Sequence, residues 1–270
     1  MPLTATQSEV LKAISANRSP ESHIAGGLAL NSAPNSPRFS EDIDIFHDVE
    51  DAVSKTSDLD VRCLESAGFT VERQIWTPLF RRISATKSGE SVKVEWAQDS
   101  AWRFFPIQQD AVLYWKLHPF DALTNKALAM AARAETRDLV DLVSHACGVF
   151  PLHSVVWAAC AKDAGFTPLS LLEWMRRNAR IDASALKETG VLLHATELKN
   201  RWLELAELTE ARIIEAAHDG VEPGVVFTDL NGVVSWYTQV GTVSHHARLG
   251  GVFPKVEGVR NQSSLRDGRA

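Results

Sequence analysis

The sequence predicts an α+β fold, in which a mixed sheet in the first part of the chain is followed by a mainly helical portion. Two observations support this prediction. Apolar and polar residues alternate with a period of two in several short segments between residues 41 and 97, as in half-buried strands. From Asp121 the chain is rich in alanine and leucine, and its pattern becomes helical. We place the boundary at this change, which gives a core over residues 1–118 and a helical portion over residues 119–270.

The first elements surround a pair of glycines. Residues 5–17 have the apolar spacing of an amphipathic helix. The segment HIAGGLALNSA, residues 23–33, predicts a strand or turn that runs into a helix. It overlaps NSAPNSPR, residues 31–38, which is rich in Pro, Asn and Ser and predicts a loop.

Strands and one helix follow this loop. EDIDIF, residues 41–46, alternates as a strand does, and a helix is expected over about residues 50–67 with Gly68 as its C-cap. Further strands are expected in FTVERQIW (69–76), LFRRISAT (79–86) and VKVEWA (92–97), with KSGES as the turn before the last.

The second half is expected to be helical. Residues 121–147 predict two consecutive helices, and the helical pattern continues to about Ala217 with breaks at Pro168 and Gly190. We predict no structure for the residues that follow, and the tail after about residue 245 is a candidate for disorder.

The composition is that of an ordinary globular protein, with 45% hydrophobic residues and a formal net charge of −6. This acidic balance argues against a nucleic-acid footprint over the whole surface but is compatible with a local basic groove.

No apolar run is long enough to cross a bilayer and no signal sequence is recognisable, so we expect no membrane partner and a cytoplasmic location. Cys63, Cys147 and Cys160 form no pairable framework, and reduced thiols are expected.

Two aspartates in EDIDIF are the strongest candidates for chemistry. On a strand, Ile43 and Ile45 face the core, while Asp42 and Asp44 face the other way with Cα atoms about 6–7 Å apart. Two carboxylates this close resist joint ionisation unless a cation joins them, and their hard oxygen ligands suit magnesium. The alternative is a strand whose solvent face carries two acids, which is the more common case for an isolated D-x-D.

A third acid strengthens the metal hypothesis. The apolar residues of VKVEWA share one face of the expected strand, so Glu95 lies on the other. If this strand neighbours EDIDIF, Glu95 completes a set of three carboxylates that can hold two Mg²⁺ ions about 3.5–4 Å apart, as in phosphoryl transfer. Taken alone, Glu95 is an ordinary surface residue, and Asp99 or Asp138 would then be the next candidates.

The glycine pair suggests a place for phosphates. Gly26 and Gly27 let backbone N–H groups approach a ligand closely, and a helix that starts there directs its positive end at an anion. Most two-glycine segments are only turns. The pair gains weight from its position shortly before Asp42.

Four segments, in the order GGLAL, RFSEDIDIF, VKVEW and NKALAMAARAETRDLVDL, resemble the nucleotidyltransferases of the AbiEii/AbiGii toxin family. These are polymerase-β-like nucleotidyltransferases and the toxin halves of bacterial toxin–antitoxin and abortive-infection modules. The similar segments run from about Gly26 to Asp141, roughly half of the chain. After about residue 150 the chain is similar only in being helical.

The resemblance implies a polymerase-β-like core and a role for each matching residue. Asp42, Asp44 and Glu95 would be catalytic and would bind two Mg²⁺ ions. Gly26 and Gly27 would hold the triphosphate, Arg38 and Ser40 would lie at the rim of the same pocket, and Lys126 would contact phosphates. Asp138 and Asp141 would close the site from the helical side, with Asp138 among the catalytic residues. Leu28 is a departure, because the family usually has Ser or Thr after the glycine pair.

The reaction implied by the resemblance is metal-dependent transfer of an NMP from an NTP to an acceptor hydroxyl. RNA, especially a tRNA 3′ end, is the leading acceptor, and a cognate antitoxin is the expected protein partner. Transfer to a protein or small-molecule hydroxyl is one alternative. A catalytically silent member that acts by binding is another, and the missing hydroxyl at Leu28 keeps it open.

Several charged and metal-binding residue types allow more than one interpretation. Lys126 and Arg133 share a helix face and could point into a cleft, whereas Arg137 and Asp141 have the spacing of an ordinary helix ion pair. For an RNA groove we expect the following cations: Arg81, Arg82 and Lys93 on the sheet, with Lys126 and Arg133 on the helix. A zinc site is the weaker alternative for His145, Cys147, His153 and Cys160, because their spacing matches no standard site.

Overall fold

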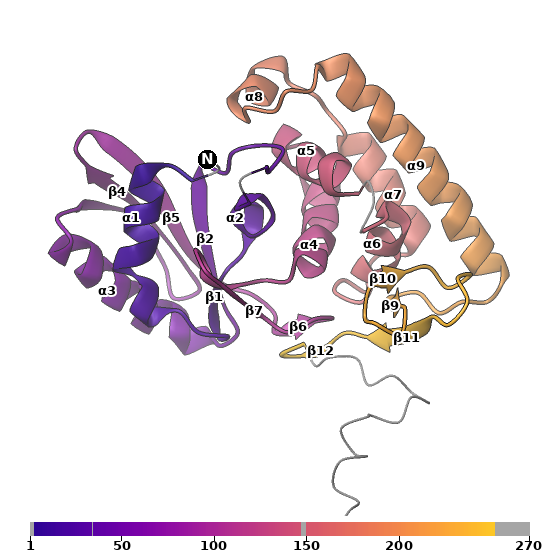
Figure 1. Ribbon diagram of the computed structural model, residues 1–270, viewed down its shortest axis with the longest axis horizontal. Coiled ribbons are helices and arrows are strands. Elements are labelled where there is room, and N and C mark those ends of the chain that lie inside the picture. The colour runs from indigo at the N-terminus through magenta and orange to yellow at the C-terminus, as the bar shows by residue number, and fades with distance from the viewer. Residues whose placement is uncertain (1–2, 34, 147–149, 252–270) are drawn as a thin grey trace, which may run out of the picture.

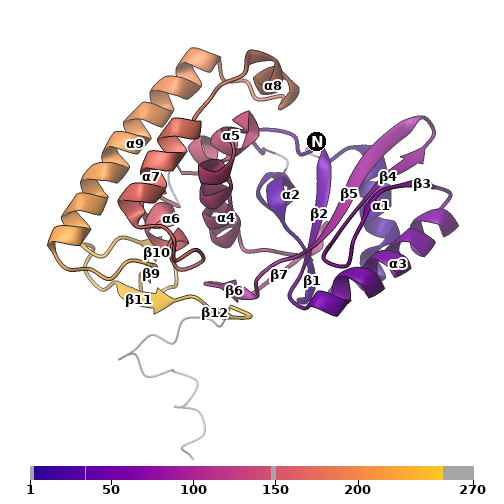
Figure 2. The same cartoon turned by 180° about the vertical axis from the view of Figure 1, so that it is seen from behind.

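The computed structural model describes residues 3–33, 35–146 and 150–251 of the chain. A half built on a sheet and a half built on helices lie side by side (Figures 1 and 2). The elements of the first half are α1 (Ala5–Ala13), the 3₁₀ turn η1 (Ser15–Asn17), β1 (Ser22–Ile24), α2 (Gly26–Asn31), β2 (Asp42–His47), α3 (Glu50–Ser66), β3 (Thr70–Trp76), β4 (Phe80–Lys87), β5 (Glu90–Gln98), β6 (Trp102–Arg103), β7 (Gln108–Asp110) and β8 (Tyr114–Lys116). Every helix and strand predicted up to residue 97 is present, although the first helix ends at Ala13. The short strands β6, β7 and β8 were not predicted.

The sheet is mixed, as predicted. Its seven strands have the order β3-β4-β5-β2-β1-β8-β7. Strand β2 pairs in parallel with β5 and antiparallel with β1, so it lies in the middle of the sheet. Both edges of β2 are therefore hydrogen-bonded, and its two faces differ in what they contact.

Helices α1 and α3 cover one face of the sheet (Figure 1). The core on this side contains Ile43, Ile45 and Trp96, which are fully buried, together with Val10 of α1 and Leu64 of α3. The period-two pattern of β2 therefore turns its isoleucines into this core. It turns the aspartates of the same strand to the opposite face.

The second half is mainly helical, as predicted, and ends in a small sheet that was not predicted. Its elements are α4 (Pro119–Ala132), α5 (Thr136–His145), α6 (Leu152–Ala159), α7 (Pro168–Asn178), α8 (Ala183–Glu188), α9 (Ala195–His218), β9 (Val225–Thr228), β10 (Val234–Ser235), β11 (Val243–His246) and β12 (Arg248–Leu249). Strands β9, β10 and β11 form an antiparallel sheet, and β12 returns to pair with β6. Pro168 starts α7, where its missing N–H has no partner to lose.

The larger core joins the two halves of the chain. It includes Leu30 of α2 and Phe104 together with residues of the helices, such as Leu123 and Trp157. The predicted division at residue 118 therefore runs through a continuous core, and its use as a domain boundary stays a prediction. Among the described residues, no helix combines the length and the apolar character needed to cross a membrane. The tail predicted to be disordered after about residue 245 begins within strands β11 and β12, where the prediction was wrong, and the part beyond residue 251 lies outside the described residues.

Candidate active site

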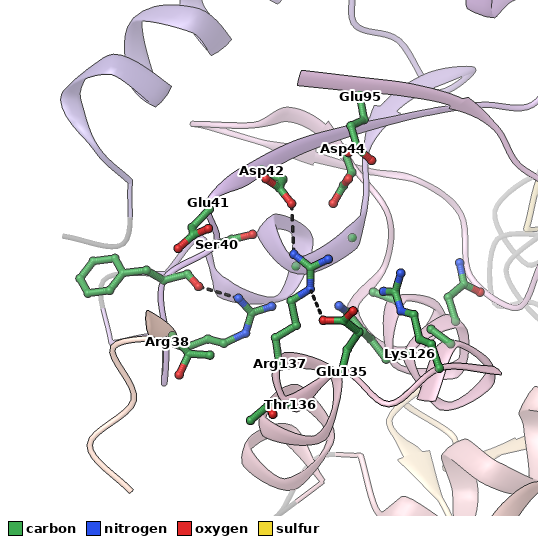
Figure 3. A pocket seen from close by; sticks show the side chains of 18 of the residues that line it. Arg38, Ser40, Glu41, Asp42, Asp44, Glu95, Lys126, Glu135, Thr136 and Arg137 are labelled. Carbon is green, nitrogen blue, oxygen red and sulfur yellow. Dashed lines mark hydrogen bonds and ion pairs between the residues drawn. The ribbon is translucent and has the colours of Figure 1, made fainter. Parts of the chain in front are cut away.

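A cavity of about 660 Å³ lies on the aspartate face of the sheet. One wall consists of β2, β5 and the segment that leads into β2, and the other consists of residues from α4, α5 and α8 (Figure 3). All of the site residues implied by the resemblance line this cavity, except Asp138 and Asp141. Their roles stay predictions, whereas their positions are given by the structure.

Three carboxylates meet on the sheet wall of the cavity. Asp44 on β2 lies directly opposite Glu95 on β5, and Asp42 lies opposite Lys93. Because residues in register on adjacent strands point to the same face, all three acids face the cavity. The expected proximity of Glu95 to the two aspartates is confirmed.

Asp44 lies in a place that disfavours its negative charge. Burial raises the pKa of Asp44 to about 6, and the carboxylates of Glu95 and Asp42 act in the same direction, against the opposing effect of Lys126. A group with this pKa is partly protonated just below neutral pH. A cation bound beside Asp44 would restore its charge.

The other two acids are bound by cationic side chains. The Nζ atom of Lys93 is 2.9 Å from Asp42 Oδ2 and 3.5 Å from Glu95 Oε1. Arg82 Nε donates to Glu95 Oε1 at 2.8 Å, and Arg137 Nη1 donates to Asp42 Oδ2 at 3.1 Å. In the positions seen here, no three His, Cys, Asp or Glu side chains among the described residues are placed to hold a metal ion together.

The three acids nevertheless fit a divalent metal such as Mg²⁺. Their donor atoms are all carboxylate oxygens, which hard cations prefer. Asp42 and Asp44 flank one position on β2, and Glu95 is the register neighbour of Asp44. Burial, with the carboxylates of Glu95 and Asp42 beside it, raises the pKa of Asp44, and a metal ion bound between these acids would offset both effects.

The glycine pair lies against this group of acids. Gly26 begins α2 with a φ of +58°, and a Cβ atom on it would lie 1.8 Å from Asp44 Oδ2. A Cβ atom on Gly27 would lie 2.6 Å from Arg38 Nη2 and 2.7 Å from Ser40 Oγ. Gly26 therefore requires glycine, a side chain on Gly27 would displace the ends of Arg38 and Ser40, and the backbone of the first turn of α2 lies at the cavity next to the carboxylates.

Arg38 lines the cavity but is committed to a buried partner. Its Nε and Nη2 atoms donate to the two oxygens of Asp141 at 2.6 and 2.7 Å, and the arginine side chain is only 4% exposed. Asn31 of α2 donates to the same carboxylate at 2.8 Å. This bidentate pair ties the segment before β2 to α5, so Arg38 holds the two walls of the cavity together.

Lys126 projects from α4 into the cavity and is held by two acids behind it. Its Nζ atom is 2.7 Å from Asp138 Oδ1 and 3.1 Å from Asp141 Oδ2, and both carboxylates are fully buried. Burial alone would raise the pKa of Asp141, but Lys126 and Arg38 outweigh it and lower the pKa to about 2. The pKa of Asp138 is also lowered, because Lys126 and Arg133 outweigh its burial. The two buried acids thus share Lys126, Arg38 and Arg133, which fix the position of Lys126 at the cavity.

Asp138 supports the cavity from behind rather than facing it. It accepts hydrogen bonds from Lys126 and, at 2.9 Å, from Arg133 Nε. Lys126 and Arg133 both line the cavity, as one of the two interpretations expected, but Arg133 follows the end of α4 in an extended conformation and does not share the helix face that was predicted for it. The position of Asp138 suits a residue that orients these cations.

Two predictions about arginines were wrong. Arg137 does not pair with Asp141 along the helix but reaches across the cavity to Asp42 (Figure 3). Arg81 is not on the cavity side of the sheet, because alternation along β4 turns it away from Arg82. It donates to Asp58 Oδ1 at 2.8 Å and packs over a tryptophan of β3 on the other face.

Helix α8 was not predicted to belong to the site. Glu188 and Thr189 line the cavity opposite the segment that leads into β2. Phe39 donates its backbone N–H to the carbonyl of Thr189 at 3.0 Å, and a Cβ atom on Gly190 would lie 2.7 Å from the Phe39 ring. Gly190, predicted as a break in the helical pattern, follows the end of α8 with a φ of +69°, a conformation that favours glycine.

Leu28 is fully buried in the core with α1 and α3 and does not line the cavity. A hydroxyl at this position would therefore point into the core in this arrangement.

The described members of the zinc alternative have separate surroundings: His145 lies 3.3 Å from Asn31 Oδ1, the ring of His153 packs on Trp236, and Cys160 contacts the carbonyl of Val156. Cys147 lies outside the described residues.

Comparisons with known proteins give similar structures but no family. No protein-family model matches the sequence, and no curated protein matches it. JHP933 from Helicobacter pylori is 18% identical, with 79% of this chain and 94% of that chain covered at a TM-score of 0.49. A candidate nucleotidyltransferase from H. pylori is 18% identical, with 79% and 98% covered at a TM-score of 0.48. The nucleotidyltransferase toxin MenT4 from Mycobacterium tuberculosis is 17% identical, with 74% and 91% covered at a TM-score of 0.46.

Two of these structures are described as nucleotidyltransferases, the class of enzyme that the four sequence segments resemble. None is named as an AbiEii or AbiGii protein, and the assignment of this chain to that family stays a prediction.

Proposed function

We propose that this chain is a nucleotidyltransferase that moves an NMP from an NTP to an acceptor hydroxyl and depends on Mg²⁺. The observation that carries the proposal is the meeting of Asp42, Asp44 and Glu95 on one wall of a cavity whose other wall supplies Lys126 and Arg133. Acids that can hold metal and cations that can hold phosphate thus face each other. The cavity volume of about 660 Å³ is within the range of small-molecule sites.

In the proposed reaction the acceptor oxygen forms a bond to the α-phosphorus. The bond from that phosphorus to the bridging oxygen of the β-phosphate breaks, pyrophosphate leaves, and the hydroxyl proton passes to solvent. Mg²⁺ held by Asp42, Asp44 and Glu95 would lower the pKa of the hydroxyl and neutralise the charge of the leaving group. Lys126, oriented by its two buried aspartates, binds the phosphate oxygens, while the backbone N–H groups of the first turn of α2 hold the triphosphate.

The proposed acceptor is RNA, with a tRNA 3′ end as the leading case, and the proposed role is that of a toxin with a cognate antitoxin in the cytoplasm. The sequence resemblance supports this part of the proposal. The cations that would meet an RNA backbone are Arg82 and Lys93 on the sheet side, which also pair with the acids of the site, and the half-exposed Arg133 on the helical side. Lys126, the other cation predicted for this groove, is almost fully buried and is left to the nucleotide. Phosphate contacts of this kind make binding fall steeply with salt.

The test is transfer of label from each α-³²P-labelled NTP in the presence of bulk RNA, a small-molecule hydroxyl or the protein alone. We expect Mg²⁺-dependent labelling of RNA and none with Asp44→Asn. Labelling of another acceptor would keep the reaction and change the substrate. Absence of transfer from every NTP, with either Mg²⁺ or Mn²⁺ present, would contradict the proposal and favour a protein that acts by binding.

A further inference from the structure

Arg137 makes a contact that the proposed reaction does not use. From the first turn of α5 its Nη1 atom reaches Asp42 Oδ2 at 3.1 Å, and its Nε atom lies 3.9 Å from Glu135 Oε2 (Figure 3). The side chain is 39% exposed. By contrast, Arg38 and Lys126 are almost fully buried on acids behind the cavity wall. Arg137 is therefore free to move within the cavity in a way that those two cations are not.

The contact stands where a metal ligand would be needed. The Oδ2 atom of Asp42 accepts both Arg137 and, at 2.9 Å, Lys93. Two cations at one carboxylate oxygen repel a divalent ion, so at least one of them has to leave before metal binds there. The side chain of Lys93 is 35% exposed, nearly as much as that of Arg137, but Lys93 stands on β5 directly opposite Asp42 and keeps Glu95 as a second partner beside it. Arg137 is the cation that can leave.

When Arg137 leaves Asp42, the triphosphate is the new partner within the cavity. The guanidinium group binds two phosphate oxygens at once, which suits an arginine on the wall opposite the carboxylates. A metal that displaces Arg137 thus makes it available for the nucleotide. A nucleotide that binds Arg137 leaves Asp42 free for the metal. By linkage, the metal raises the affinity for the nucleotide by the same factor as the nucleotide raises the affinity for the metal.

We propose that Arg137 is a positioning residue that competes with the metal for Asp42 and binds the triphosphate once it is displaced. This inference rests on the proposed function. It assigns to Arg137 a coupling between two ligands of the same cavity. The pairing with Asp42 seen here is then the state that precedes loading.

The first test measures Mn²⁺ binding to the full-length protein without nucleotide, by the loss of the free-ion signal in electron paramagnetic resonance. Arg137→Gln should bind Mn²⁺ about two- to fivefold more tightly than the unmodified protein, the scale expected for removing one half-exposed ion pair. Arg133→Gln is the matched control, because Arg133 lines the same cavity but binds Asp138. Equal or weaker Mn²⁺ binding by Arg137→Gln, or the same gain in Arg133→Gln, would overturn the proposal.

The second test measures binding of a non-hydrolysable NTP analogue in the presence of Mg²⁺. Arg137→Gln should bind the analogue more weakly, and Arg137→Lys should recover part of the loss, since it restores the charge without the bidentate geometry. Unchanged affinity in Arg137→Gln would also overturn the proposal. Asp44→Asn distinguishes a failure of the proposed function from a failure of this inference. If Asp44→Asn leaves Mn²⁺ binding unchanged, the proposed metal site is wrong as well. If Mn²⁺ binding requires Asp44 but is the same in Arg137→Gln, only the role of Arg137 is wrong.

Discussion

Replacing Asp44 by asparagine should make the metal-free protein more stable at alkaline pH, because it removes a carboxylate that the fold holds against its preference. The pKa of Asp44 is raised from 3.8 to about 6 by burial and by its two acidic neighbours. At 1.36 kcal/mol per pKa unit, the ionised carboxylate costs the native state about 2–3 kcal/mol. This cost is fully present above the folded pKa of about 6 and disappears below the unfolded value, since the folded state binds the proton more tightly.

Urea unfolding in EDTA measures this effect as the difference between Asp44→Asn and the unmodified protein. We expect a gain in the free energy of unfolding of about 2–3 kcal/mol at pH 8, which shrinks to about a third of that at pH 4.5. Glu204→Gln, on the exposed side of α9, is the control for removing one negative charge and should show neither the gain nor its pH dependence. A variant that is equally or less stable at pH 8, or a gain of the same size at both pH values, would refute the reasoning.

The remaining predictions address the backbone, the phosphate side and the biology. Gly26→Ala should abolish transfer and lower the free energy of unfolding by at least about 1–2 kcal/mol, because φ at this position is +58° and the new Cβ would overlap the carboxylate of Asp44. Calorimetry measures the stability and the transfer assay measures the activity. Lys126→Ala should weaken nucleotide binding, measured by fluorescence titration, and should also cost about 3 kcal/mol in urea unfolding, since two buried aspartates lose a cation. Expression without a partner protein should arrest bacterial growth, and Asp42→Ala should relieve the arrest; arrest that persists would indicate toxicity by binding.

The sheet and its acids could be predicted because their signal is local. Alternation along β2 and β5 determines which side chains share a face, and this placed Asp42, Asp44 and Glu95 away from the core. The same rule should have separated Arg81 from its neighbour on β4, since adjacent residues of a strand cannot both face one cavity. Arg81 therefore belongs to the face of the sheet that packs on α3, and only Arg82 faces the cavity.

The contacts across the cavity could not be predicted from the sequence. Arg137 meets Asp42 because α5 packs opposite β2, and nothing in either segment specifies that approach. Helical spacing showed that Arg137 and Asp141 could pair, but Asp141 is buried against Arg38, where a bidentate contact is stronger than an exposed helix pair. The wall formed by α8 likewise depends on tertiary packing.

The most direct measurement is Mg²⁺-dependent pyrophosphate release by Glu95→Gln beside the unmodified protein, with NTP and RNA present. If the three carboxylates hold the metal, the unmodified protein releases pyrophosphate in step with labelling of RNA, and EDTA stops it. Glu95→Gln should then be slower by about a hundredfold or more, which corresponds to a barrier higher by roughly 3 kcal/mol. Release at the unmodified rate by Glu95→Gln would show that the third acid lies elsewhere, and no release by either protein would contradict the proposed reaction itself.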